Sequence, residues 1–186
     1  VLAGIVVGSV FMSLVMLTKS VADPYSKLPA ITFWLMGSLA AVTASEVRVL
    51  AVPVVCGLIP LVLLRWRLNI LSLGEDEARA LGLNTTRLRM LVVACSTLMT
   101  AAAVAVGGVV GWVGLVIPHF ARLLVGPDFR VLLPAALLLG GLYLLLVDNL
   151  ARSLLATEIP LGVLTSLIGA PVFIYLLARV KRGGWA

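Results

Sequence analysis

The sequence has few charged residues for its length. Of its 186 residues, 12% are charged, whereas 62% are hydrophobic and the mean hydropathy is +1.18. A soluble domain usually carries about 25% charged residues, so this chain has too few polar side chains to cover a globular surface in water. These proportions exclude an ordinary soluble enzyme, a disordered tail and a secreted disulfide scaffold. They indicate that lipid is the solvent for most of the surface.

Residues that commonly build metal centres and catalytic sites are also scarce. The chain has two cysteines, Cys56 and Cys95, both inside apolar runs, and a single histidine, His119. The cysteines give neither a metal motif nor a disulfide framework. The sequence contains no phosphate loop of the form Gly-x-x-x-x-Gly-Lys-Ser/Thr, no catalytic carboxylate pair and no nucleophile–base arrangement. We therefore predict no catalytic, cofactor-binding or metal-binding residues. The net charge of +6 does not predict nucleic-acid binding, because the basic residues do not cluster with aromatic ones.

The sequence instead has long apolar runs, which predict an all-α, polytopic transmembrane bundle. A helix needs about 20 mostly apolar residues to cross a bilayer. Six runs are interpreted as spans, at residues 1–17, 47–66, 88–106, 113–125, 131–156 and 161–178. Residues 28–42 contain Phe33 and Trp34, which suit the headgroup level, and predict a short interfacial helix; a seventh span is the alternative. Because the chain starts in the middle of an apolar helix, it is expected to begin inside a longer protein.

The fourth apolar run is short and interrupted. Four glycines between residues 107 and 114 crowd the connection before it, and Pro118 lies inside it. In lipid, broken helices are tolerated only where protein or a water-filled cavity covers the exposed backbone, so we predict a broken span beside an internal cavity. His119 is expected to hydrogen-bond within this broken span, and a metal-ligand role is the weaker alternative. Arg122 is expected at the cytoplasmic end of the span.

The basic residues divide unequally between the two sides of the membrane. With six spans, one side receives ten of them: Arg65, Arg67, Arg79, Arg87, Arg89, Arg122, Arg130, Arg179, Lys181 and Arg182. The other side receives four: Lys19, Lys27, Arg48 and Arg152. Cytoplasmic loops carry the excess of Lys and Arg, so the first group, the C-terminal end and the loop of residues 65–89 are predicted to be cytoplasmic.

The only dense charged cluster lies in this loop, at Gly74-Glu75-Asp76-Glu77-Ala78-Arg79-Ala80-Leu81-Gly82-Leu83. Its two glycines bracket a short run of good helix formers. Acidic residues in the first turn favour the helix dipole, and Glu75 can pair with Arg79 one turn later. Residues 84–86, Asn-Thr-Thr, supply capping groups for the next helix. Two interpretations stay open, a rigid docking element below the bundle or a solvated loop that folds locally.

Several motifs occur in the order of a known family. They are residues 74–83, Gly111-Trp112-Val113-Gly114-Leu115-Val116-Ile117-Pro118-His119 followed by Arg122, Arg130-Val131-Leu132-Leu133-Pro134, Asp148 with Arg152, and Ile159-Pro160-Leu161-Gly162-Val163 leading to Gly169-Ala170-Pro171-Val172-Phe173. Together they resemble the FecCD family, the permease subunits of ABC importers for iron–siderophore complexes, haem and vitamin B12. The resemblance covers the whole chain as a single transmembrane permease domain (1–186), similar to roughly the second half of a ten-helix permease.

The resemblance implies a multi-pass protein of the bacterial plasma (inner) membrane that moves its substrate by alternating access. Its partners would be ABC ATPase subunits below, a periplasmic or lipid-anchored substrate-binding protein above, and a second permease subunit in a homo- or heterodimer. The implied ATPase-coupling helix region is 74–83, with Gly74, Glu75, Ala78, Arg79, Leu81 and Gly82. Iron–siderophore is the expected cargo because it is the commonest one in the family.

Arg152 lies near the outer end of the fifth predicted span. The resemblance implies that an arginine near this point pairs with a carboxylate of the binding protein. The alternative is a local pair with Asp148, four residues earlier on the same helix, which satisfies both charges. Both pairings can occur in turn.

Three other classes of membrane protein compete with an importer as interpretations of the sequence. An ion-coupled secondary transporter usually needs ionisable groups at the midplane, and the predicted spans are nearly free of them. A channel needs a polar filter, and none is visible in the sequence. A membrane scaffold without transport activity would not require the bracketed charged helix. The importer is therefore the preferred interpretation, and the secondary transporter and the scaffold remain its alternatives.

Overall fold

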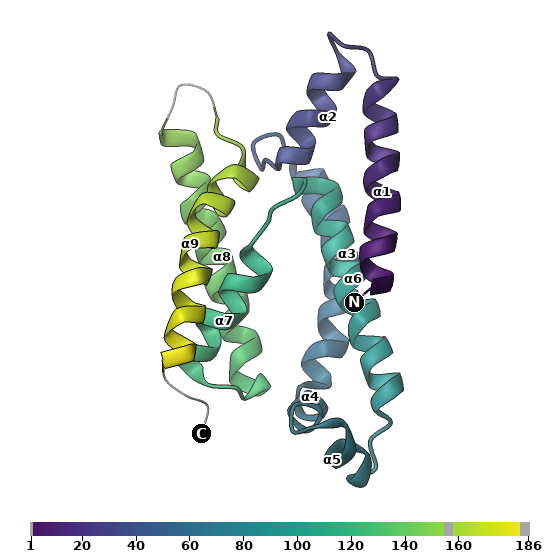
Figure 1. Cartoon of the computed structure of the whole chain (residues 1–186), viewed down its shortest axis with the longest axis vertical. Helices are drawn as coiled ribbons and strands as arrows, with labels where there is room; N and C mark the ends of the chain where they lie inside the picture. The colour runs from purple at the N-terminus through teal and green to yellow at the C-terminus, as the bar shows by residue number, and fades with distance from the viewer. Residues whose placement is uncertain (1, 155–157, 183–186) are drawn as a thin grey trace.

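The structure is a computed structural model that describes the backbone of residues 2–154 and 158–182, and the side chains of these ranges as far as Tyr175. The described chain folds into helices joined by short connections (Figure 1). The helices are α1 (Leu2–Ser20), α2 (Lys27–Met36), α3 (Ala44–Leu63), α4 (Arg65–Leu71), α5 (Glu75–Ala80), α6 (Thr85–Gly107), α7 (Val113–Val125), α8 (Phe129–Ser153) and α9 (Leu161–Arg182). Within these ranges no β-strand is found, and the predicted all-α bundle is confirmed.

Four helices are long and apolar enough to cross a membrane, namely α1, α3, α6 and α8. They coincide with the first, second, third and fifth predicted spans, and α9 coincides with the sixth. The fourth predicted span is α7, which has 13 residues. At about 1.5 Å per residue such a helix reaches about 20 Å, whereas the hydrocarbon core is about 30 Å thick. We conclude that α7 is a half-length helix that cannot cross the membrane alone.

Two predicted elements end earlier in the structure than expected. The second span ends at Leu63 rather than Trp66, because the chain turns at Leu64 and Trp66 belongs to α4. The short helix predicted at 28–42 is found as α2, but it ends at Met36 because Gly37 adopts a left-handed φ of 76°. Residues 155–157, at the predicted end of the fifth span, lie outside the described residues.

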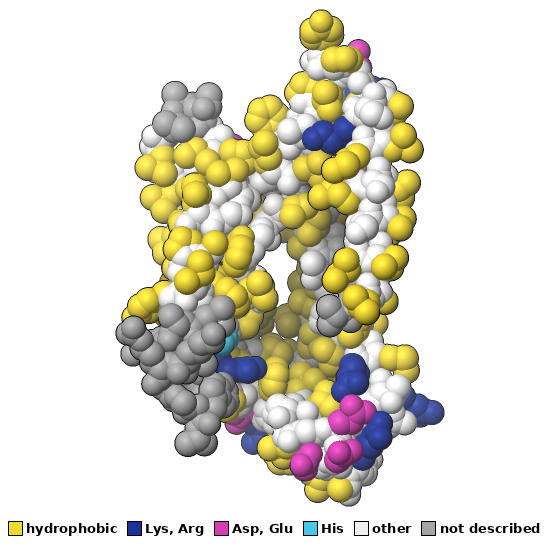
Figure 2. Space-filling model, viewed as in Figure 1, with side chains coloured by type: hydrophobic (Ala, Val, Ile, Leu, Met, Phe, Trp, Pro, Cys, Tyr) yellow, Lys and Arg dark blue, Asp and Glu magenta, His cyan; other side chains and the backbone are white. Residues whose placement is uncertain are grey.

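The helices form two groups that lie side by side (Figure 1). In the first group, α1 to α6, α3 packs along α6; in the second, α7, α8 and α9 pack on one another, and α2 of the first group contacts α9 of the second. The contact between α3 and α6 is close at Gly57, where a Cβ atom would lie 2.5 Å from Cγ of Met99. The second group has a buried core that includes Val147, Leu161 and Leu164. The space-filling view is open between the two groups at mid-height, and they meet above and below this opening (Figure 2).

Local capping explains where several of these helices begin. Thr43 and Glu46 form a capping box at the start of α3, in which each side chain accepts a hydrogen bond from the other residue's backbone N–H. Asn84 accepts from the N–H of Arg87 at the start of α6, as its sequence position predicts. Asp128 accepts from the N–H of Arg130 at the start of α8. These caps fix the entry of the three helices from both ends of the bundle.

The two ends of the bundle carry different sets of connections (Figure 1). One end carries α4, α5 and the turn between α7 and α8, and the other carries the α1–α2, α2–α3 and α8–α9 connections. Acidic and basic side chains gather at the end that carries α5 (Figure 2). The sequence-based division of the loops into two sets therefore matches a division between two ends. That the α5 end faces the cytoplasm stays a prediction.

The break that precedes α7 lies in its connection rather than at its proline. Residues 108–112 descend from the end of α6 without helical structure, and Gly108 and Trp112 both have a positive φ, of 72° and 67°. Trp112 fits at this position because it lies against Gly169 of α9. A Cβ atom on Gly169 would lie 2.6 Å from the Cβ atom of Trp112. Pro118 lies inside a continuous α7, since a proline removes a single hydrogen bond, here the one to Gly114. The predicted break within the span itself was therefore wrong.

Candidate functional site

The charged segment 74–83 forms a helix with a defined start and end, as its flanking glycines predict. Gly74 caps the start of α5 with a φ of 141°, and Gly82 follows its end with a φ of 80°. The N–H of Leu83 donates to the carbonyl of Ala78, and the N–H of Gly82 donates to that of Arg79. This pair of bonds is a Schellman motif, which satisfies carbonyl groups that the helix end would leave free. The loop is therefore locally rigid.

The carboxylate of Glu75 joins α5 to the start of α6. Its Oε1 lies 2.7 Å from Nη2 of Arg79, and its Oε2 lies 3.1 Å from Nη2 of Arg89. The buried hydroxyl of Thr85 donates to the same carboxylate and accepts from Nε of Arg79, each at 3.4 Å. The hydrogen bond and the charge of Arg89, followed by the charge of Arg79, lower the pKa of Glu75 below its usual value of 4.5. The pairing of Glu75 with Arg79 was predicted from their spacing, whereas the two partners on α6 were not.

The sequence contains a pattern from which the two partners of Glu75 on α6 could have been predicted. Thr85 and Arg89 are four residues apart, so they share one face of the predicted helix after the charged segment. A carboxylate that folds back onto that helix would meet a hydroxyl and a guanidinium together. Ala78, which faces the interior of this junction, is 0% exposed.

The outward side of this region carries two leucines. Leu73 precedes α5 and is 68% exposed, and Leu81 follows it and is 63% exposed. Exposed leucines that flank a charged helix form a surface suited to contact with another protein. From here on, residues 73–83 are called the hairpin. Its six predicted coupling residues thus divide by role: Gly74 and Gly82 shape it, Glu75, Ala78 and Arg79 hold it, and Leu81 faces outward.

At the opposite end of the bundle, Arg152 pairs with Asp148. Its Nε lies 2.9 Å from Oδ2 and its Nη2 lies 3.2 Å from Oδ1 of that carboxylate, while Glu158 lies further away at 4.0 Å. The local pair, one of the two predicted alternatives for Arg152, is therefore present. The Arg152 side chain is 43% exposed, so its guanidinium remains accessible from outside the bundle.

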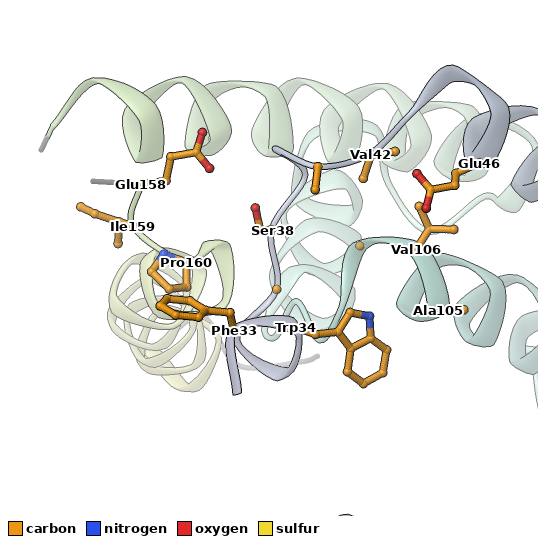
Figure 3. A pocket seen from close by; sticks show the side chains of 13 residues that line it. Phe33, Trp34, Ser38, Val42, Glu46, Ala105, Val106, Glu158, Ile159 and Pro160 are labelled. Carbon is orange, nitrogen blue, oxygen red and sulfur yellow. The ribbon is translucent and has the colours of Figure 1, made fainter. Parts of the chain in front are cut away.

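A pocket of about 730 Å³ lies at the same end, between the two helix groups (Figure 3). Phe33 and Trp34 of α2 form part of its wall, and the carboxylates of Glu46 and Glu158 lie on opposite sides with Ser38 between them (Figure 3). Glu46 is held in place because its Oε2 accepts hydrogen bonds of 2.7 Å from both the backbone N–H and the hydroxyl of Thr43. From the sequence the two aromatic residues were expected at the headgroup level, and this pocket was not predicted.

The remaining predicted residues lie on α7. The imidazole of His119 meets the ring of Phe173 edge to face at a centroid distance of 6.3 Å, and Trp112 lies 6.0 Å from the same ring. No hydrogen bond to the imidazole is found among the described residues, so aromatic packing between α7 and α9 takes the place of the expected hydrogen bond. Arg122 lies in the last turn of α7, at the end that carries α5. Within the described ranges, no three His, Cys, Asp or Glu residues gather as a metal site would require.

These features define a polytopic helical membrane protein with a half-length helix and a rigid charged hairpin at one end. Residues 1–179 match the model of the FecCD transport family, and the chain belongs to this family. It is 48% identical over 185 residues to the molybdate import system permease protein MolB of Haemophilus influenzae, covering 99% of this chain and 55% of that protein. It is 40% identical over 181 residues to an iron chelatin transport system permease protein of Helicobacter pylori, covering 97% and 55%.

A solved structure has the same fold. It is described as an inward-facing conformation of a metal-chelate type ABC transporter, and its superposition on this chain has a TM-score of 0.91 at 47% sequence identity. The match covers 96% of this chain and 58% of that one. The chain thus spans about half the length of the curated relatives it matches.

Proposed function

We propose that this chain forms about half of the permease subunit of an ATP-driven importer in a bacterial plasma membrane. The observation that carries the proposal is the hairpin, a rigid element fixed to the end of an apolar bundle. A locally disordered loop could not push on the helices beside it. A helix whose carboxylate is bonded to the next span, through Thr85 and Arg89, transmits a displacement to that span.

The proposed partner of the hairpin is an ABC ATPase subunit. Leu73 and Leu81 supply exposed apolar contacts, and the exposed Asp76 and Glu77 supply charge around them. ATP can shift the permease between outward and inward access only if it binds one state of the complex more tightly than the other. Closure of the ATPase pair on ATP would move the hairpin and provide that difference.

At the opposite end we propose the substrate-binding protein as the partner. Arg152 is half-exposed and paired within its own helix, so exchanging Asp148 for a carboxylate of the binding protein replaces one ion pair by another. The pocket beside it opens at the same end and lies between the helix groups, where cargo released from the binding protein would enter. A second permease subunit would complete the pathway.

For the cargo we propose a ferric chelate of the siderophore type, with molybdate as the second candidate because of the similarity to MolB. The support is the lining of the pocket. Phe33 and Trp34 offer apolar aromatic surface to an organic ligand, whereas the carboxylates of Glu46 and Glu158 disfavour a small dianion such as molybdate. Uptake of a radiolabelled ferric hydroxamate and of molybdate into proteoliposomes distinguishes the two.

The proposed function is tested with Leu81→Asp in the full-length permease. The side chain is exposed, so the variant should fold and melt as the wild type does, but it should lose at least about tenfold in affinity for the ATPase subunit, because a charge replaces an apolar contact. Tyr25→Asp is the matched control, since Tyr25 is 95% exposed at the opposite end. Wild-type recovery of the ATPase with Leu81→Asp would contradict the docking assignment.

A further inference from the structure

The short helix α4 is joined to the start of α8 by one amide side chain. Nδ2 of Asn69 donates to Oδ1 of Asp128 at 2.6 Å, and Oδ1 of Asn69 accepts from the N–H of Phe129 at 2.7 Å. The two partners are 59 and 60 residues further along the chain. Both polar atoms of the amide are therefore used, and they fix its orientation between the two helices.

The surroundings of this amide make the contact specific. Asp128 also caps α8 by accepting from the N–H of Arg130 at 2.8 Å. One helical turn before Asn69, on the same face of α4, the ring of Trp66 lies under the guanidinium of Arg130 at 4.6 Å. Leu68 and Leu132 are both buried, one on each helix. A charge-assisted hydrogen bond, a cap and a cation–π contact thus converge on the first turn of α8.

The bridge that Asn69 forms is important because of where it lies between the two helix groups. In the part of the chain that the structure describes, the two bonds of Asn69 are the only side-chain hydrogen bonds between the group of α1 to α6 and the group of α7 to α9. At the opposite end the groups meet through backbone, where the N–H of Leu161 donates to the carbonyl of Gly37. Between these two joints the molecule is open (Figure 2). Only one joint therefore lies at the hairpin end.

We propose that Asn69 is a positioning residue that carries movement of the hairpin to α8. This inference rests on the proposed function, in which an ATPase displaces the hairpin. Movement of the hairpin reaches α6 through the ion pair of Glu75 with Arg89. Among the described residues, no ion pair of this kind joins α5 to the second helix group. That group is reached through α4, which precedes the hairpin by a few residues. Because α8 is one continuous helix of 25 residues, displacement of its first turn is passed to the far end, where Arg152 lies.

The test exchanges the two polar groups of the bridge. Asn69→Asp places two carboxylates against each other and removes the donor, so the bridge opens. Adding Asp128→Asn restores a complementary donor, because the carboxylate now at position 69 accepts from Phe129 and from Nδ2 of the amide now at position 128. A single oxygen of Asp128, Oδ1, accepts from both Asn69 and Arg130, so the new amide must turn for its own oxygen to keep the cap on Arg130. Asn69→Ala is compared with the matched control Asn149→Ala, because among the described residues the Asn149 side chain bonds within α8, to the carbonyl of Leu145.

The first readout needs no cargo. Spin labels at Ala80 on α5 and Val131 on α8, both exposed, report their separation in the full-length permease assembled with its ATPase. With an intact bridge the separation stays narrow and unchanged on ATP binding; in Asn69→Asp it broadens, and the exchange variant restores it. An unchanged separation in Asn69→Asp overturns the proposal, as does a failure of the exchange to restore it.

The second readout is the amount of ferric hydroxamate transported per ATP hydrolysed. It should fall about tenfold in Asn69→Asp and Asn69→Ala, as expected for loss of hydrogen bonds to a charged group, and remain at the wild-type level in the exchange variant and in Asn149→Ala. If the wild-type permease fails to bind an ATPase, the proposed function is wrong. The bridge is then judged from the label separation without ATP, where Asn69→Asp must still broaden it.

Discussion

At the end that carries α5, side chains hold the helices to one another, whereas at the opposite end backbone lies against backbone. The hairpin end is joined by the carboxylate of Glu75, the amide of Asn69 and the caps at Asn84 and Asp128. These contacts are directional and charge-assisted, so they keep one geometry. An end built in this way is suited to transmitting a displacement without deforming.

The opposite end is built from the unwound segments that follow α2 and α6 and precede α9. Leu161 donates its N–H to the carbonyl of Gly37, and Ser38 donates its N–H to that of Gly107. A Cβ on Gly162 would lie 2.5 Å from the carbonyl oxygen of Met36, so these segments approach closely only because glycine is present. Few side-chain bonds would have to break for the segments to separate. The difference between the ends indicates a rigid input at the hairpin and an adaptable opening at the pocket.

The largest effect is expected from adding a methyl group to the backbone joint. Gly162→Ala would place a Cβ 2.5 Å from the carbonyl oxygen of Met36 and 2.9 Å from that of Val109, so α2 or α9 must move. Overpacking of this kind costs about 2–3 kcal/mol, and we expect a lower midpoint of thermal unfolding in detergent. Gly141→Ala on α8 is the matched control, since a Cβ there meets nothing within 4 Å. Equal melting of the two variants would show that the opposite end is not closely packed.

Lowering the pH is expected to have a smaller effect, a loss of stability that is confined to the hairpin. The pKa of Glu75 lies below its usual value of 4.5, chiefly because of Arg89, so its ionised form stabilises the folded hairpin above that pH. This stabilisation is lost as the pH falls below 4.5 and through the lowered pKa. Hydrogen exchange of the α5 amides, corrected for the intrinsic effect of pH, should therefore accelerate in this range before that of α3 does.

The variant Glu75→Gln provides the check on this prediction. It removes the titrating group, so its hairpin should exchange rapidly at neutral pH and show no further step in acid. A step that persists in Glu75→Gln would assign the acid response to another carboxylate, and the ion pairs of Glu75 would not be what holds the hairpin.

At both ends of the bundle, contacts within one helical turn could be predicted from the sequence. Glu75 with Arg79, Asp148 with Arg152 and the cap at Asn84 were predicted because their partners lie within one helical turn. The bounds of α7 also matched its apolar run, although that run was interpreted as a short span rather than as a half-length helix. Such contacts depend on local geometry, which spacing determines.

The contacts that join distant segments were missed for the opposite reason. Asn69 and Asp128 are 59 residues apart, and nothing in either neighbourhood indicates that their helices meet. The pocket likewise depends on where α2 and the α8–α9 connection are placed by the fold. Proline misled the prediction at Pro118, because a helix that loses one hydrogen bond continues when its neighbours support it, and the break falls instead at residues 108–112.

The smallest effect on the fold, but not on partner binding, is expected at Arg152. Its pair with Asp148 is exposed and lies within one helix, so Arg152→Ala should leave thermal unfolding of the full-length permease unchanged.

If this arginine contacts a carboxylate of the binding protein, the variant should bind that protein about tenfold more weakly, because a buried carboxylate loses its hydrogen-bonded partner. Arg48→Ala is the matched control, since Arg48 is also exposed at this end and, within the described ranges, its side chain bonds to the carbonyl of Ala44. Asp148→Asn, which weakens the local pair without removing the guanidinium, should bind at least as tightly as the wild type. Weaker binding in Arg48→Ala together with unchanged binding in Arg152→Ala would place the docking contact at the start of α3, and the end opposite the hairpin would then receive its partner through the first helix group.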